Sequence, residues 1–375
     1  MPVKRRYFDW AAAAPPDPLP APGPFGNPSS RHTEGRRARE ELERSRARCA
    51  AVLGTVPENL YFTSGGTEAN ALVLHSLLLR RGSGSLLYSA AEHPSVRENA
   101  ESLSRLGKKV LPVEVEADGG VSRRGLRRAL EKAENPRMAA IMGVNNETGR
   151  VTDIPALAGV LREAGGTIHL HCDLVQQAGK LPLGSALDEA DSAAFSAHKL
   201  GGPRSVGLLF LRRPLEALYA GGGQERGLRP GTENVDGAAA LADCLERRAL
   251  PGRLGEEEAA LRWKALITGL RSLERCTLIP ADRQAEDPRF SPWILQLAFD
   301  KIPGEVMVRA LDEAGFAAST GSACSSAKQE RPVLSAMGLD PKTAFEGFRL
   351  SQGWSTEMED IEALLEALQT IAKKW

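Results

Sequence analysis

The chain has 375 residues, 42% of them hydrophobic, which is enough for about two domains with buried cores. Its 48 basic residues balance 48 acidic residues, and this neutrality argues against a general nucleic-acid or membrane-surface binder. No apolar run of about 18 residues predicts a membrane span, and the N-terminal segment has no apolar signal core. The five scattered cysteines form no CxxC pair, so we expect a cytoplasmic protein with reduced thiols.

The first part of the chain predicts an arm, a helix and a Gly-rich turn. Residues 15–24 contain six prolines and are expected to form an extended arm. A charged helix with one apolar face is predicted over residues 34–53. A strand at 60–63 then leads through SGGTEAN, residues 64–70, into an apolar helix. This order places free backbone N–H groups at a helix start, which is a common phosphate site, although an ordinary capped helix has the same pattern.

Strands and helices alternate over about the first 240 residues, which predicts a doubly wound, mostly parallel sheet. Helices are predicted at 122–132 and 154–164. The predicted strands are 60–63, 86–89, 109–115, 139–144, 167–172, a strand ending at 195, and 206–211. Polar side chains follow several of these strands at their carboxyl ends, where open α/β sheets bind ligands. We therefore expect these side chains to converge on one crevice.

The last third of the chain begins with a Gly-rich polar loop at residues 221–235. Helices are predicted at 238–248, 256–273, 305–314 and 358–373, and strands at 294–299 and 348–350. A loop of small residues at 319–330 carries Cys324, and the strand at 348–350 carries Arg349. A cysteine among small polar neighbours is typical of a reactive thiol more than of a buried structural one.

Lys199 is the first candidate for chemistry, because it follows a buried strand in DSAAFSAHKLGGP, residues 191–203. Burial disfavours the charged form of lysine and lowers its pKa. A neutral amine can attack an aldehyde and hold it as a Schiff base. By itself the segment is also compatible with a surface lysine after an edge strand.

A Schiff-base lysine, a phosphate site and an acid at a strand end together indicate pyridoxal phosphate (PLP). Lys199 would bind the aldehyde, and Asp173 would pair with the pyridinium nitrogen. His93 could stack on the ring, while Gln176 and Asn146 could contact the phenolic oxygen and substrate atoms. The residues expected to hold the phosphate are Gly66, Thr67, Ser196 and His198.

Other interpretations of these residues remain open. Asp173 could cap a helix, and His93 could be a turn residue before proline. His169 and His171 lie two apart on a strand and could be metal ligands, but no third ligand is evident.

Eight stretches between residues 25 and 351 carry a family resemblance. They are FGNPSSRH, TSGGTEAN, AEHPSV, VNNETG, the step from Asp173 to Gln176, FSAHKLGGP, GGGQERGLRPGTENV and STGSACSS. With these motifs in this order, the chain resembles the NifS/IscS-type cysteine desulfurases, which are fold-type I PLP enzymes of the class V aminotransferase group. The resemblance implies an α/β fold with a mainly parallel seven-stranded sheet in a large PLP-binding domain, residues 12–251. Residues 1–11 and 252–375 would form a smaller α+β domain carrying Cys324 and Arg349.

The resemblance also implies roles for individual residues. Lys199 is the Schiff-base lysine, His93 stacks on the ring, and Cys324 supplies the thiolate that attacks the substrate sulfur. Arg349 binds the substrate carboxylate together with contacts from Asn146. The threonine that matches Thr232 reaches the phosphate of the other subunit in the family, which implies a homodimer with shared sites.

The implied reaction converts L-cysteine into L-alanine. Lys199 removes the Cα proton, and a persulfide forms on Cys324. An acceptor protein or small thiol then takes the sulfur for iron–sulfur clusters, thio-cofactors or tRNA thiolation. The alternatives are a selenocysteine lyase, a class V aminotransferase, and a PLP-binding homologue with little turnover that acts through protein contacts.

The chain departs from the family pattern at three places. Alanines at 12–14 replace two threonines, and the Pro-rich arm at 15–24 replaces a helix. Trp354 stands where the family has arginine. We expect the first two changes to open the entrance of the site and the third to alter the region near Arg349.

Overall fold

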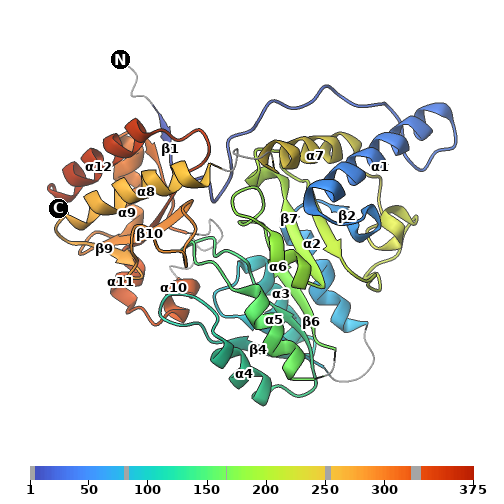
Figure 1. Cartoon of the computed structure of the whole chain (residues 1–375), viewed down its shortest axis with the longest axis horizontal. Helices are drawn as coiled ribbons and strands as arrows, with labels where there is room; N and C mark the ends of the chain where they lie inside the picture. Colours follow the sequence, from blue (N-terminus) through green and yellow to red (C-terminus); the bar gives the residue numbers. More distant parts are fainter. Residues whose placement is uncertain (1–4, 80–83, 166, 250–254, 322–330) are drawn as a thin grey trace.

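The computed structural model describes residues 5–79, 84–165, 167–249, 255–321 and 331–375, and a seven-stranded sheet lies at the centre of its larger part (Figure 1). In spatial order the strands are β2 (Leu60–Thr63), β8 (Gly207–Leu211), β7 (Ser192–Ser196), β6 (His169–Asp173), β5 (Pro136–Ala140), β3 (Ser85–Ser89) and β4 (Lys109–Val113). β8 runs antiparallel to both of its neighbours, and the other adjacent pairs are parallel. The predicted α/β fold with a mainly parallel sheet is confirmed.

Helices cover both faces of this sheet, which explains why its central strands are buried at almost every position. In β8, Leu208 and Phe210 pack into one apolar cluster, while Leu209 and Leu211 pack into another on the opposite face. The helices in the first cluster are α1 (Thr33–Leu53), α4 (Arg123–Lys132), α5 (Ile154–Glu163), α6 (Gly184–Glu189) and α7 (Val235–Ala249). The second cluster contains α2 (Gly66–His75) and α3 (Pro94–Arg105). Short 3-10 turns are η1 (Pro57–Asn59), η2 (Ser76–Leu78), η3 (Ala197–Lys199) and η4 (Gln224–Gly227).

A smaller part contains most of the C-terminal elements, coloured orange and red in Figure 1. Its antiparallel sheet has the order β12 (Gly347–Ser351), β10 (Ile294–Phe299) and β9 (Cys276–Ile279). The N-terminal strand β1 (Arg6–Tyr7) joins this part by pairing in parallel with β11 (Phe316–Ala317). The helices are α8 (Glu256–Arg271), α9 (Gly304–Glu313), α10 (Pro332–Ala336), α11 (Pro341–Glu346) and α12 (Met358–Ala372). The predicted domain boundaries stay a prediction.

Several elements differ from the sequence prediction: the helices α3, α6, α10 and α11 and the short strand β11 were not predicted. Two further strands also differ. The strand expected at 139–144 is β5, which ends at Ala140. Beyond it the chain stays beside β6 through the hydrogen bonds from Ile141 N to His171 O and from Gly143 N to Asp173 O, and it then turns back. β9 was not predicted, because this four-residue strand is defined by its pairing with β10 and not by a local pattern.

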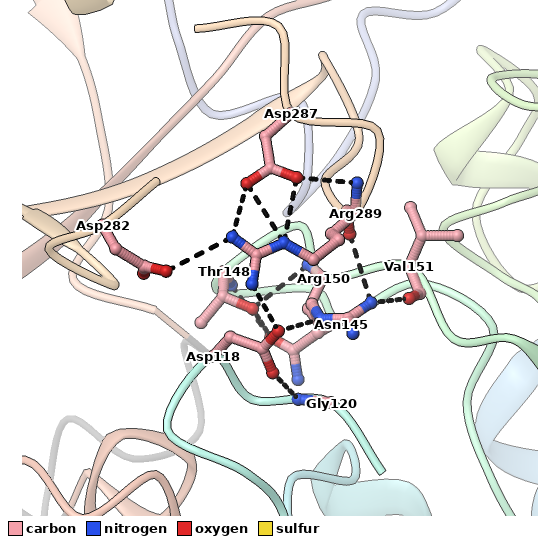
Figure 2. Close-up of polar contacts among 9 residues, drawn as sticks. All are labelled: Asp118, Gly120, Asn145, Thr148, Arg150, Val151, Asp282, Asp287 and Arg289. Carbon is pink, nitrogen blue, oxygen red and sulfur yellow. Dashed lines mark hydrogen bonds and ion pairs between the residues drawn. The ribbon is translucent and has the colours of Figure 1, made fainter. Parts of the chain in front are cut away.

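A cluster of charged side chains around Arg289 joins the two parts (Figure 2). The Arg289 guanidinium contacts the carboxylates of Asp118, Asp282 and Asp287 at N–O distances of 3.1, 3.3 and 2.7 Å. Asp118 also contacts Arg150 at 3.0 Å. Asp118 and Arg150 come from loops of the larger part, and the other three side chains precede β10 in the smaller part. The cluster therefore holds the turn after β5 against the smaller part.

Candidate functional site

Lys199 lies in η3, directly after the fully buried strand β7. Its Nζ donates hydrogen bonds to Ala11 O at 2.6 Å and Ala12 O at 2.7 Å. Burial lowers the pKa of Lys199 to about 8, and the positive charge of the nearby Arg349 guanidinium is the second cause. An appreciable fraction of this amine is therefore neutral near pH 7, as nucleophilic attack requires.

The start of α2 faces the same space as Lys199. Gly66 and Thr67 form the first turn of this helix and line the cavity with Ser196 and His198. A side chain at Gly66 would meet Val175 Cγ2 at 2.7 Å, so this position accepts only glycine without rearrangement. Burial, together with the charge of Lys199, lowers the pKa of His198 to about 4, and its Nδ1 lies 2.7 Å from Ser196 Oγ. The first backbone N–H groups of α2 thus face the cavity together with the polar side chains of Ser196 and His198. Such a group of polar atoms is what an anion site requires.

Asp173 is held at the end of β6 by two hydrogen bonds. Val175 N donates to Oδ1 at 3.0 Å, and Asn70 Nδ2 donates to Oδ2 at 2.8 Å. The Asn70 carbonyl oxygen in turn lies 2.8 Å from His171 Nε2. Burial lowers the pKa of His171 to about 3, so this histidine is neutral and its Nε2 is the donor to Asn70. This chain of bonds fixes which end of the Asn70 amide faces Asp173.

His169 and His171 do not form a metal site with their neighbours. Their ring nitrogens lie 2.7 and 2.8 Å from the same Ser192 Oγ. Across the described ranges, no group of three or more His, Cys, Asp or Glu side chains could hold a metal ion.

His93 caps α3 through its Nδ1, which accepts a hydrogen bond from Ser95 N at 3.1 Å. Burial lowers the pKa of His93.

Arg349 on β12 brings the smaller part into the site. Its Nη1 donates to Asn146 O at 2.8 Å, and its Nη2 contacts Asp9 Oδ1 at 2.8 Å. Its Nε is buried and has no hydrogen-bond partner among the described residues, and the same holds for Asn146 Oδ1. Because Asn146 and Arg349 both line the cavity, these two orphaned atoms indicate a polar ligand.

One cavity of about 200 Å³ collects nearly all the predicted site residues. Those that line it are Gly66, Thr67, His93, Asn146, Asp173, Gln176, Ser196, His198, Lys199 and Arg349. Thr232 does not line it and is exposed on the loop before α7. Cys324 lies outside the described residues.

The N-terminal segment forms one wall of this cavity. Ala14 N donates to His198 O at 2.9 Å and Asp17 N to Gly201 O at 2.7 Å, so the Pro-rich arm starts beside the lysine segment. Trp354 packs edge-on against Trp10 with ring centroids 4.6 Å apart. The side chain that replaces the family arginine therefore anchors the segment next to the site.

Several supporting groups were not identified from the sequence. Asp9 contacts Arg349, and Asn70 supports Asp173 from α2. Lys180 is buried behind the cavity wall. A charged residue within the otherwise apolar segment 178–181 was the only local signal for it.

Comparisons with known proteins agree with this geometry. The family model for aminotransferase class V matches residues 23–364. A NifS/IcsS protein homolog from Lactobacillus delbrueckii subsp. bulgaricus is 35% identical, covering 92% of this chain and 90% of the relative. An IscS-like cysteine desulfurase from Mycobacterium tuberculosis is 34% identical, covering 96% and 95%. A solved NifS-like protein has a TM-score of 0.87 and 30% identity, covering 99% of this chain and 100% of that chain. These matches confirm the resemblance that the motifs indicated.

Proposed function

Because the chain belongs to the class V aminotransferase family, we propose that it is a PLP-dependent cysteine desulfurase acting on L-cysteine. The observation that carries the proposal is the single cavity in which a lysine of lowered pKa meets a helix start, a buried aspartate and an arginine. The lysine matches the aldehyde of PLP, the helix start its phosphate, and the aspartate its ring nitrogen. The arginine matches the carboxylate of an amino-acid substrate.

The residues present fit PLP in their donor and acceptor chemistry. Lys199 supplies the amine, and the free N–H groups of α2 face the cavity where a phosphate would lie. Asp173 supplies a carboxylate that Asn70 and Val175 already orient. When bound, PLP supplies an electron sink for the charge that develops at the substrate Cα.

The chain's own groups would then bind the substrate and move the proton. Arg349 would hold the substrate carboxylate, with its orphaned Nε as one donor. Lys199, once released from the cofactor, would take the Cα proton, because its lowered pKa suits a base near neutral pH. His93 would stack on the ring, and Gln176 would contact its phenolic oxygen.

Two parts of the proposal concern Cys324, which lies outside the described residues, and Thr232, which does not line the cavity. The Cys324 thiolate would attack the substrate sulfur and form a persulfide as the substrate Cβ–Sγ bond breaks. The electron pair of that bond would stay on the carbon fragment, which takes up protons and leaves as L-alanine. An acceptor protein or small thiol would then take the sulfur. Thr232 is exposed and would serve the phosphate of a second subunit, which makes the active form a homodimer. Within the described ranges, no helix is both long and apolar enough to cross a membrane.

Purified protein mixed with L-cysteine tests the proposal by the release of alanine and sulfide. Borohydride reduction should fix PLP on Lys199, and Cys324→Ser should keep the bound cofactor but release almost no alanine. Mass spectrometry after brief exposure to L-cysteine should find extra sulfur on Cys324 alone. Alanine release by Cys324→Ser at the wild-type rate would rule out the persulfide route.

A further inference from the structure

Lys180 is a buried lysine that the proposed reaction does not use. Its side chain is only 1% exposed, and it lies behind the cavity wall without lining the cavity. Its Nζ donates a hydrogen bond of 2.8 Å to Gln176 Oε1. Trp293 Nε1 donates to Lys180 O at 2.8 Å, so the backbone at this position is held as well.

The hydrogen bond from Lys180 determines the orientation of the Gln176 side-chain amide. A protonated Lys180 has only N–H groups to offer, so the amide must present its oxygen to it. The amide nitrogen then faces the other way and donates to Ala11 O at 2.8 Å, at the wall of the cavity. Nε2 carries two hydrogens, and this bond uses only one of them. The Ala11 carbonyl and the Lys180 donor thus favour the same orientation of the amide, and loss of Lys180 removes one of the two contacts that fix it.

We propose that Lys180 is a positioning residue that locks the Gln176 amide with its N–H group toward the cavity, as a donor to the phenolic oxygen of bound PLP. This inference rests on the proposed function, because it assigns a partner to the second N–H of Nε2. Lys180 acts on the cofactor only through Gln176.

The environment of Lys180 supports a functional reason for keeping it. Burial, followed by the charges of Lys199 and Arg349, lowers its pKa to about 7. The two charges that lower the pKa of Lys180 are thus both positive. Lys180 in turn contributes to the lowered pKa of His198. A buried amine among cations destabilises the fold relative to an apolar side chain of the same length. Such a departure from ordinary core composition is typical of functional sites.

The test is the pH titration of the visible absorption of PLP bound to Lys199 in the holoenzyme. A donor to the phenolic oxygen favours its ionised form and weakens its hold on the imine proton. Lys180→Met should therefore raise the titration midpoint, by about half a pH unit to one unit for one lost hydrogen bond. Lys180→Gln keeps a neutral donor and should restore a midpoint near that of the wild type. Lys132→Met, at an exposed lysine at the end of α4, is the matched control and should change nothing.

A double-mutant cycle separates positioning from a direct charge effect. In a Gln176→Ala background, Lys180→Met should produce no further shift. An equal shift with and without Gln176 would show that Lys180 acts by its charge, and an unchanged midpoint in Lys180→Met would overturn the inference alone. A wild-type protein that forms no visible band with PLP would overturn the proposed function, and this inference with it.

Discussion

Replacement of Lys180 by methionine in the cofactor-free protein should change the free energy of unfolding with opposite signs at low and high pH. Methionine keeps most of the length of the side chain and removes the amine. In the unfolded chain the lysine keeps its proton up to about pH 10.5, whereas in the folded protein it loses the proton at about 7. Between these values the unfolded state binds more protons, so the lysine makes wild-type stability rise with pH.

The magnitude follows from the two pKa values. Lowering the pKa from 10.5 to about 7 corresponds to about 5 kcal/mol at 1.36 kcal/mol for each pH unit. This penalty is fully present below about pH 7 and disappears as the pH approaches 10.5. Methionine also leaves Gln176 Oε1 without its donor, which costs about 1–3 kcal/mol at every pH. The variant should thus be more stable than the wild type by about 2–4 kcal/mol at pH 6, and slightly less stable near pH 10.

Urea denaturation of both cofactor-free proteins across this pH range measures the difference. The gain from Lys180→Met should decrease by about 1.4 kcal/mol for each pH unit above 7. Lys132→Met serves as the control, because this lysine is exposed in the folded protein. A variant that is less stable than the wild type at pH 6, or a difference that does not depend on pH, would refute the reasoning.

Two further predictions concern ion pairs. Asp9→Asn should lower the KM for L-cysteine about tenfold, the equivalent of about 1.4 kcal/mol. The reason is that the Asp9 carboxylate occupies Arg349 Nη2, which the substrate carboxylate needs. Steady-state alanine assays measure the KM, and an unchanged or higher value would contradict this prediction. Glu225→Gln should lower the free energy of unfolding by about 2–3 kcal/mol, because it replaces the buried carboxylate that binds the Arg46 guanidinium through two hydrogen bonds and leaves Glu43 as its carboxylate partner. Glu246→Gln, which breaks a pair between partly exposed side chains, should cost at most about 1 kcal/mol in the same denaturation experiment, and equal losses in both variants would count against the burial argument.

The alternation of short apolar strands with helices was readable from the sequence because each element carries its own periodic pattern. The two helix-covered faces of the sheet explain why the central strands are buried along most of their length. β9 was not predicted, although the equally short β2 was, because its pairing with β10 is what defines it as a strand. The end of β5 was misplaced because residues 141–144 stay apolar after they have left the strand.

Much of the candidate site followed from the same local logic. Gly66, Asp173 and Lys199 each stand at the carboxyl end of a strand of one sheet. Parallel strands bring these ends to the same edge, so residues more than 100 positions apart were expected to meet, and they do. The residue types then indicated the cofactor chemistry before any distance was known.

The sequence by itself therefore determined the sheet, the edge that carries the site and the side chains that follow each strand, because these depend on local periodicity and on the direction of parallel strands. Only the tertiary structure decided how those side chains are held. Asp9 reaches Arg349 across 340 positions, and Ala11 and Ala12 receive the Lys199 amine through their backbone carbonyls, which no side-chain pattern reveals. Lys180 is an ordinary lysine in the sequence, and its burial against Gln176 becomes evident only when distant elements pack around it.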